Sequence, residues 1–138
     1  MLSNQIKKNL ELIADRLNQE KVSWLLTGSV NLALQGVDIS TCHDIDIVVL
    51  PSDLKMVENI FQNDLVYSIK TKTSLKDDET KFKTFKFKID NIEVEVFGAD
   101  RDLYPISLLK NKESLIKVKI GNNEIFCYPL EIEKEIYK

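Results

Sequence analysis

The chain has 138 residues, of which 43% are hydrophobic and 30% are charged, and its formal net charge is −3. This length predicts one domain, residues 1–138, with enough chain for a core but little for a separate substrate-binding domain. The mildly acidic charge gives no global argument for nucleic-acid binding. No apolar run approaches the length that crosses a bilayer and no leader-like segment is found, so we expect a cytoplasmic protein that does not bind membranes.

The first part of the chain alternates helical and extended patterns. Apolar residues three and four apart predict an amphipathic helix over 4–20, and a buried strand is expected at 22–27. The pair Gly28-Ser29 then opens a short, mostly apolar helix, which Gly36 ends. A glycine lets the backbone approach closely at such a turn, and the start of a helix favours a bound phosphate.

The next strand carries two aspartates that alternate with isoleucines, Asp44-Ile45-Asp46-Ile47. Successive side chains of a strand point to opposite faces, so Asp44 and Asp46 project together while the isoleucines enter the core. Two neighbouring carboxylates repel each other unless a cation or a proton lies between them. At neutral pH, Mg²⁺ with phosphate oxygens in its shell is the natural partner.

The rest of the chain is predicted to form a helix, a strand and two hairpins. The polar stretch 71–81 is interpreted as a loop, and Asp90-Asn91 is a two-residue hairpin signal. The expected elements are a helix that is capped by the segment Pro51-Ser52-Asp53 and runs to about Asn63, strands at 65–70, 82–89, 92–97, 115–120 and 124–128, and a short helix from Pro129. Together the elements predict an α/β (α+β) fold, a mixed β-sheet with helices packed mainly on one face.

The order of an apolar strand, Gly-Ser, a short helix and an Asp-x-Asp strand resembles the nucleotidyltransferase superfamily that includes DNA polymerase beta, especially its small stand-alone members. Segments 25–29 (Leu-Leu-Thr-Gly-Ser) and 44–46 (Asp-Ile-Asp) match in identity, order and spacing. The resemblance covers residues 1 to about 97. It implies a nucleotidyltransferase-like fold and Mg²⁺-dependent transfer of a nucleotidyl group from a nucleoside triphosphate, such as ATP, to a hydroxyl.

The resemblance also implies roles for individual residues. Gly28 and Ser29 would hold the nucleotide triphosphate, and Asp44 and Asp46 would bind Mg²⁺. The superfamily has a third carboxylate on a later strand, which binds metal and assists the acceptor hydroxyl. Glu95 is assigned to this catalytic and metal-binding role because its neighbours in the sequence are apolar.

Each of these assignments has a plain structural alternative. Ser29 can be a helix N-cap that has no role in binding phosphate. Glu93 is the other candidate for the third carboxylate. If Asp90-Asn91 is a two-residue turn, Lys88 lies opposite Glu93 and Lys86 lies opposite Glu95, so both glutamates can form cross-strand ion pairs instead.

The function is therefore expected to be that of a Mg²⁺-dependent nucleotidyltransferase whose acceptor is a small molecule, a protein or an RNA. The alternative is a non-catalytic nucleotidyltransferase-fold module that binds a partner, as an antitoxin does. Because the chain has little room for an acceptor-binding domain, we expect a partner subunit or a homodimer.

Overall fold

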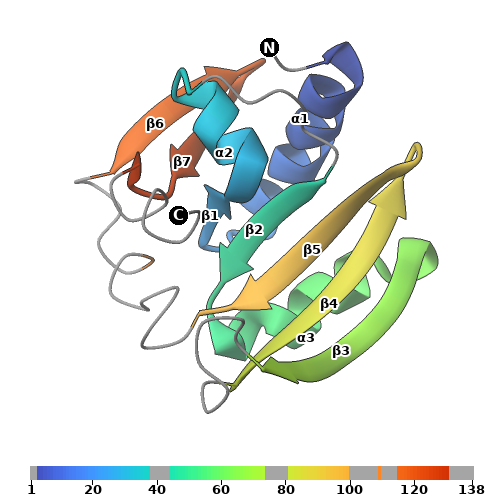
Figure 1. Cartoon of the computed structure of the whole chain (residues 1–138). Coiled ribbons are helices and arrows are strands. Elements are labelled where there is room, and N and C mark those ends of the chain that lie inside the picture. The colour runs from blue at the N-terminus through green and yellow to red at the C-terminus, as the bar shows by residue number, and fades with distance from the viewer. Residues whose placement is uncertain (1–2, 38–43, 74–80, 100–108, 110–114, 131–138) are drawn as a thin grey trace.

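The computed structural model describes residues 3–37, 44–73, 81–99, 109 and 115–130. Within them a seven-stranded sheet has the order β3-β4-β5-β2-β1-β7-β6 (Figure 1). The helices are α1 (Asn4–Gln19), α2 (Gly28–Leu34) and α3 (Leu54–Ile60), with 3₁₀ turns at Pro51–Asp53 and Gln62–Asp64, and the strands are β1 (Trp24–Thr27), β2 (Ile45–Val49), β3 (Leu65–Thr73), β4 (Lys81–Ile89), β5 (Ile92–Gly98), β6 (Ile116–Ile120) and β7 (Asn123–Cys127).

The sheet is mixed, as the sequence predicts. Strand β2 pairs with β5 in parallel and β1 pairs with β7 in parallel, while the other neighbours are antiparallel. The two parallel pairs join segments that are far apart in the sequence. The pairing of β2 with β5 is the one that matters for the site, because it places the aspartate strand beside the strand of the two glutamates.

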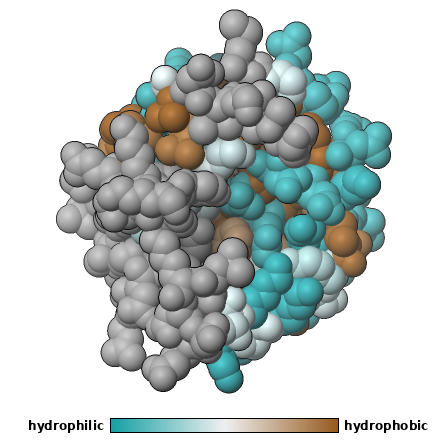
Figure 2. Space-filling model, in the orientation of Figure 1, coloured by the Kyte–Doolittle hydropathy of each residue, from teal (hydrophilic) through white to brown (hydrophobic). Residues whose placement is uncertain are grey.

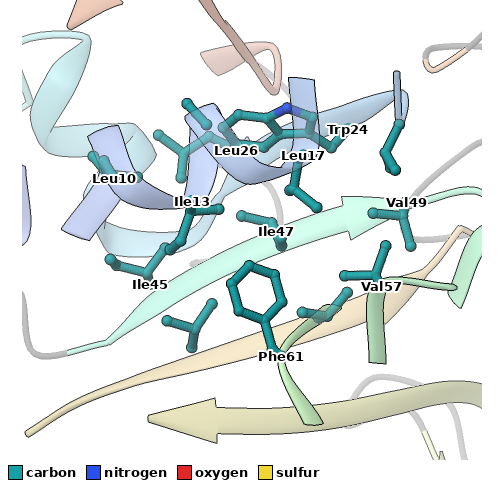
Figure 3. Packing of buried hydrophobic residues seen from close by; sticks show 14 of the residues in the cluster. Leu10, Ile13, Leu17, Trp24, Leu26, Ile45, Ile47, Val49, Val57 and Phe61 are labelled. Carbon is teal, nitrogen blue, oxygen red and sulfur yellow. The ribbon is translucent and has the colours of Figure 1, made fainter. Parts of the chain in front are cut away.

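One face of the sheet is covered by α1 and α3 (Figure 1), and the main core lies under them. Leu10, Ile13 and Leu17 of α1 are fully buried against the sheet, and Ile47 of β2 and Val57 of α3 belong to the same cluster (Figure 3). Burying an aliphatic side chain of this size contributes roughly 1.5–3 kcal/mol. This packing fixes the direction of β2, so its alternate residues are directed to the other face.

The hairpin between β4 and β5 turns at Asp90 and Asn91, whose φ angles are 49° and 67°. Positive φ at both central residues is the signature of a type I′ turn. The resulting register pairs Lys88 with Glu93 and Lys86 with Glu95, which confirms the predicted alignment of the two strands.

Two local predictions are wrong. Strand β3 continues to Thr73, and β4 starts at Lys81, so only the middle of the predicted loop at 71–81 lies between strands. The side chain of Asp53 makes no capping hydrogen bond, because a 3₁₀ turn precedes α3 and Asp53 is already helical. The predicted loop at 37–42, except Val37, and the C-terminal helix beyond Leu130 lie outside the described residues.

None of the helices in the described part of the chain has both the length and the hydropathy to cross a membrane.

Candidate active site

The turn from β1 into α2 touches the aspartate strand. Gly28, the first residue of α2, has a φ of +77°, a conformation that favours glycine. A Cβ atom built on Gly28 would collide with Oδ2 of Asp46. Thr27, which precedes the glycine, is the register partner of Asp46. The absence of a side chain at position 28 therefore lets the backbone of the turn lie directly against the Asp46 carboxylate.

Ser29 is the second residue of α2, which follows directly on Gly28. The N-cap position belongs to Thr27, whose side chain makes no capping hydrogen bond. The alternative that Ser29 acts as the N-cap is therefore wrong. Ser29 follows directly on the residue that contacts Asp46, and its predicted role toward phosphate stays a prediction.

The two aspartates share one face of the sheet at the start of β2. Asp46 is half-buried within β2, and Asp44 is exposed and immediately precedes the strand. Ile45 and Ile47, which alternate with Asp46, are fully buried on the other face. The alternation predicted from the sequence thus directs the carboxylates away from the core. His43, which precedes Asp44, lies outside the described residues.

Glu95 lies beside Asp46 on the neighbouring strand. The parallel register of β2 and β5 pairs Asp46 with Glu95, and Ile45 with Val94. Because partners in register share a face, the Glu95 side chain is directed to the same side of the sheet as that of Asp46. Glu93, the other candidate, is two residues nearer the β4–β5 turn and is not the partner of Asp46. The geometry thus favours Glu95 as the third carboxylate without testing its role.

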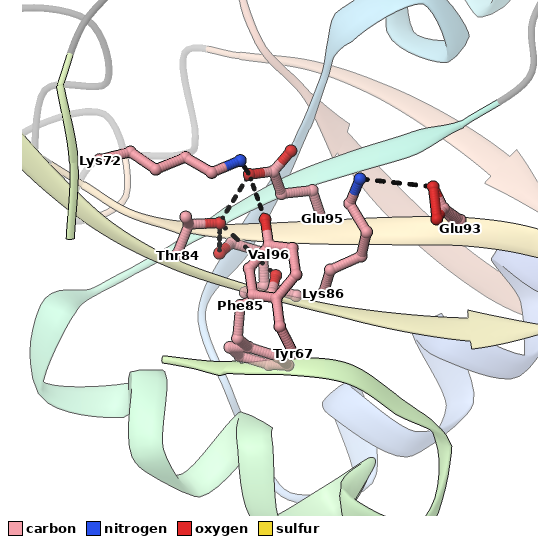
Figure 4. A network of polar contacts seen from close by, with 8 residues as sticks. All are labelled: Tyr67, Lys72, Thr84, Phe85, Lys86, Glu93, Glu95 and Val96. Carbon is pink, nitrogen blue, oxygen red and sulfur yellow. Dashed lines mark hydrogen bonds and ion pairs between the residues drawn. The ribbon is translucent and has the colours of Figure 1, made fainter. Parts of the chain in front are cut away.

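Three donors hold one oxygen of Glu95 (Figure 4). Oε2 accepts hydrogen bonds from the Tyr67 hydroxyl at 3.0 Å and from the Thr84 hydroxyl at 2.9 Å, and it forms an ion pair with Lys72 Nζ at 2.9 Å. The Glu95 side chain is 15% exposed. Burial raises the pKa of this carboxyl, but Lys72, Thr84 and Tyr67 outweigh burial and hold the pKa below its usual value. Glu95 is therefore ionised at neutral pH.

The predicted ion-pair partners need a correction. Lys86 lies opposite Glu95 in register, but its ammonium forms an ion pair with Glu93, diagonally across the hairpin, at 3.4 Å. Glu95 is paired with Lys72 of β3 instead. Within the described residues, neither ion pair predicted from the register is formed, because long lysine side chains reach diagonal neighbours as readily as opposite ones.

The residues suit a magnesium ion that is completed by phosphate. In the described part of the chain, no group of three or more His, Cys, Asp or Glu side chains converges as a metal site. Mg²⁺ is commonly held by one or two carboxylates together with the phosphates of a substrate. Asp44 and Asp46 supply such carboxylates. Because Gly28 has no Cβ atom, the backbone of its turn lies against the Asp46 carboxylate. The donor set therefore fits Mg²⁺ together with a nucleotide.

Tyr67, Lys72 and Thr84 were missed by the sequence analysis as partners of Glu95. Tyr67 and Lys72 lie on β3, whose pairing with β4 has register shifts between Leu65 and Lys70. Which of its side chains reach β5 depends on those shifts, and no local pattern predicts them. Thr84 could have been found, because the hairpin register places it on the same face as Glu95.

Comparisons with known proteins are in line with this geometry. A family model described as aminoglycoside-2''-adenylyltransferase matches residues 9–138. The structure of TM1012 from Thermotoga maritima, assigned as a nucleotidyltransferase, is similar with a TM-score of 0.78 and 29% identity, over 99% of this chain and 85% of that one. A search of curated proteins gave no match.

Two further solved structures share the fold at low identity. ANT(2'')-Ia in complex with adenylyl-2''-tobramycin has a TM-score of 0.62 and 13% identity, over 97% of this chain and 75% of that one. The lincosamide antibiotic adenylyltransferase LnuA, bound to lincomycin, has a TM-score of 0.60 and 14% identity, over 95% and 85% of the two chains. At this identity the likeness shows the fold alone.

Proposed function

The chain belongs to the aminoglycoside-2''-adenylyltransferase family, within the nucleotidyltransferase superfamily, and from this membership we propose that it is a Mg²⁺-dependent enzyme that moves the adenylyl group of ATP to a hydroxyl of an acceptor. The observation that carries the proposal is the contact between the Gly28 turn and Asp46, with Glu95 as the register partner of Asp46. A phosphate-binding turn, a metal-binding carboxylate and a second acid next to it are what this reaction needs.

The donor half of the site is formed by β1, α2 and β2. Gly28 and Ser29 would hold the triphosphate, with the close backbone approach at Gly28 placing it beside Asp46. Asp44 and Asp46 would hold Mg²⁺, which neutralises the charge of the phosphates when it is bound. The two carboxylates and the turn would therefore hold the α-phosphate next to strand β5, which pairs with β2.

Glu95 would act on the acceptor. In the transfer, the acceptor oxygen forms a bond to the α-phosphorus, and the bond from that phosphorus to the pyrophosphate oxygen breaks. The proton of the acceptor hydroxyl must leave, and the Glu95 carboxylate, whose residue is the register partner of Asp46, would take it. Because Tyr67, Lys72 and Thr84 all contact Oε2, we assign the proton transfer to the other oxygen, Oε1.

The acceptor is proposed to be a small molecule with a hydroxyl. The two similar adenylyltransferase structures contain an adenylylated antibiotic and a bound antibiotic, and both are small molecules. Protein and RNA acceptors are the other classes that the assay includes.

The test is transfer of label from α-³²P-labelled ATP. The purified protein, Mg²⁺ and the labelled ATP are incubated with a panel of hydroxyl compounds, total RNA and a protein extract, and the products are separated. We expect a labelled product that needs Mg²⁺ and wild-type protein and that disappears in Asp46→Asn. Glu95→Gln should also abolish the product while it keeps most of the Mg²⁺–ATP binding, because a base acts in the transition state.

A second candidate function, a non-catalytic binding module, is favoured by one observation. Oε2 of Glu95 is held by an ion pair and two hydrogen bonds, a state typical of a structural carboxylate. The labelling assay is therefore repeated with each of the four α-labelled ribonucleotides. If the folded wild-type protein labels nothing with any of them and is not stabilised by Mg²⁺ with ATP, the non-catalytic module replaces the enzyme as the best account.

A further inference from the structure

The strand order divides the candidate site into a side for the nucleotide, called the donor side, and a side for the acceptor hydroxyl, called the acceptor side. From Asp46 on β2, the sheet continues through β1 to the Gly28 turn in one direction. In the other direction it continues through Glu95 on β5 to β4 and β3. If the triphosphate lies at the Gly28 turn, the acceptor lies on the other side of the α-phosphorus, over β5, β4 and β3. The side chains on that part of the sheet therefore select the acceptor.

These side chains follow from the strand registers. Glu93 and Glu95 of β5 share their face with the even-numbered residues of β4, because cross-strand partners point to the same side. The pairing of β4 with β3 continues that face to Tyr67, Lys70 and Lys72. The four lysines of this face, here called the lysine face, are Lys70, Lys72, Lys86 and Lys88. Figure 2 shows hydrophilic residues gathered over β3–β5 on the face turned to the viewer.

The lysine face has more positive than negative charge. Both of its glutamates already form ion pairs with lysines of the same face, Glu95 with Lys72 at 2.9 Å and Glu93 with Lys86 at 3.4 Å. Lys70 and Lys88 are exposed, and among the described residues neither takes part in an ion pair. Two ammonium groups thus remain in excess on the side where the acceptor must approach Glu95.

Tyr67 gathers three of the four lysines, Lys70, Lys72 and Lys86, around its ring. The ammonium of Lys70 lies 3.8 Å from the centre of the Tyr67 ring, and those of Lys72 and Lys86 lie 5.3 and 5.8 Å from it. The Tyr67 hydroxyl meanwhile donates to Glu95. The positive charge of Lys70, Lys72 and Lys86 is therefore concentrated next to the candidate catalytic carboxylate, and Lys88 lies further along β4, opposite Glu93.

We propose that the acceptor of this enzyme is an anion, a small hydroxyl compound that carries a phosphate or carboxylate group, and not a polycationic aminoglycoside. This inference rests on the proposed adenylyl transfer and adds the charge of the acceptor to it. Like charges held close together repel, and a surplus of ammonium groups beside the site attracts anions and rejects polycations. The anionic group would lie over the lysine face, attracted by the surplus ammonium groups of Lys70 and Lys88, with the hydroxyl toward Glu95.

Binding tests this without any transfer. The thermal unfolding midpoint is measured with glucose 6-phosphate, gluconate, uncharged glucose or tobramycin, each in the presence of Mg²⁺ and α,β-methylene-ATP so that the donor side is filled. We expect the two anions to raise the midpoint, with an effect that falls as salt is added, and glucose and tobramycin to leave it unchanged. Stabilisation by tobramycin, or equal stabilisation by glucose, overturns the inference.

The matched variants are Lys70→Gln/Lys88→Gln and Lys81→Gln/Lys83→Gln. Each variant removes two positive charges, the first one from β3 and one from β4 and the second both from β4. Lys81 and Lys83 alternate with the lysine face and are directed to the other side of β4. Removing the two surplus ammonium groups of the lysine face should weaken anion binding about tenfold in Lys70→Gln/Lys88→Gln. The Lys81→Gln/Lys83→Gln variant should bind the anions as the wild type does, and equal weakening in both variants contradicts the inference.

Failure of the proposed function gives a different result. If α,β-methylene-ATP with Mg²⁺ does not stabilise the protein, the proposed nucleotide site is wrong. The thermal unfolding measurements with the four compounds are then repeated without nucleotide. Anion binding that depends on Lys70 and Lys88 still supports an anion site there, and anion binding that is absent or independent of them overturns it.

Discussion

Position 28 shows how much of the site depends on one missing side chain. The φ of Gly28 is +77°, and an added Cβ would collide with the Asp46 carboxylate. Gly36, at the other end of α2, also has a positive φ, +90°, but apart from its chain neighbours no atom of the described residues lies within 4 Å of the place where its Cβ would be. The two glycines therefore separate the effect of backbone strain from the effect of the contact with Asp46.

Gly28→Ala is expected to lose the stabilisation that Mg²⁺ with ATP gives, because the new methyl group displaces Asp46. Gly28→Ala and Gly36→Ala should each also lower the free energy of unfolding by about 1–3 kcal/mol, because both positions have a left-handed backbone conformation. Thermal unfolding with and without Mg²⁺–ATP measures both effects. Gly36→Ala is the control, and it should keep the ligand-dependent rise. Loss of the rise in both variants, or in neither, argues against a nucleotide site at the Gly28 turn.

Glu95 gives a pH prediction. Burial raises the pKa of Glu95, but Lys72, Thr84 and Tyr67 lower it further, so the folded-state pKa lies below the unfolded one. The ionised carboxylate therefore stabilises the fold above about pH 4.3, the ordinary pKa of glutamate, and this stability is lost as the pH falls through the folded-state value. Glu95→Gln should lower stability at pH 7 by about 1 kcal/mol and flatten the fall in acid.

The measurement is urea unfolding between pH 3 and 7 for the wild type, Glu95→Gln and Lys72→Gln. Because the Lys72 ammonium is a principal cause of the lowered pKa of Glu95, Lys72→Gln should flatten the acid fall as well. Glu58, whose pKa is also lowered, keeps part of the slope in every variant. A slope that is identical in the wild type and both variants rules out the Lys72–Glu95 pair as a stabilising interaction.

At the scale of the element, β2 shows what a local pattern can and cannot predict. Its alternation of buried isoleucines with aspartates was predicted from the sequence, and so were the helix α1 and the β4–β5 hairpin with its Asp90-Asn91 turn. The extension of β3 to Thr73 was not predicted, because segment 71–73 is polar and has no apolar face. Its extended conformation comes from pairing with β4, a tertiary interaction that overrides local propensity.

The two aspartates at β2 also give a prediction about metal binding. In Asp44→Asn/Asp46→Asn, the stabilisation by Mg²⁺ with ATP should vanish, because a ligand stabilises only the state that binds it. The unliganded variant should be as stable as the wild type or more stable, since repulsion between the two carboxylates is removed. Thermal unfolding of the free and liganded proteins is the measurement. A variant that is destabilised without ligand would indicate that the aspartates serve a structural ion pair.

At the scale of the whole molecule, the site is assembled by non-local pairing. Asp46 and Glu95 are 49 residues apart in the sequence and become neighbours through the parallel pairing of β2 with β5. The resemblance to the nucleotidyltransferases named these residues without showing that they meet. That lysines of β3 and β4 share one face likewise depends on the order of β3, β4 and β5 and on the register shifts of β3. The predicted partner subunit or homodimer stays a prediction.

The central claim is that the Gly28 turn and Asp46 together hold a metal–nucleotide complex. The most direct measurement is a crystal structure with Mn²⁺ and α,β-methylene-ATP, in which anomalous scattering locates the metal. We predict a manganese peak about 2.1 Å from a carboxylate oxygen of Asp46, a distance typical of such ions, with the triphosphate against Gly28 and Ser29. A metal bound without Asp44 and Asp46, or a triphosphate bound away from the Gly28 turn, would contradict the claim.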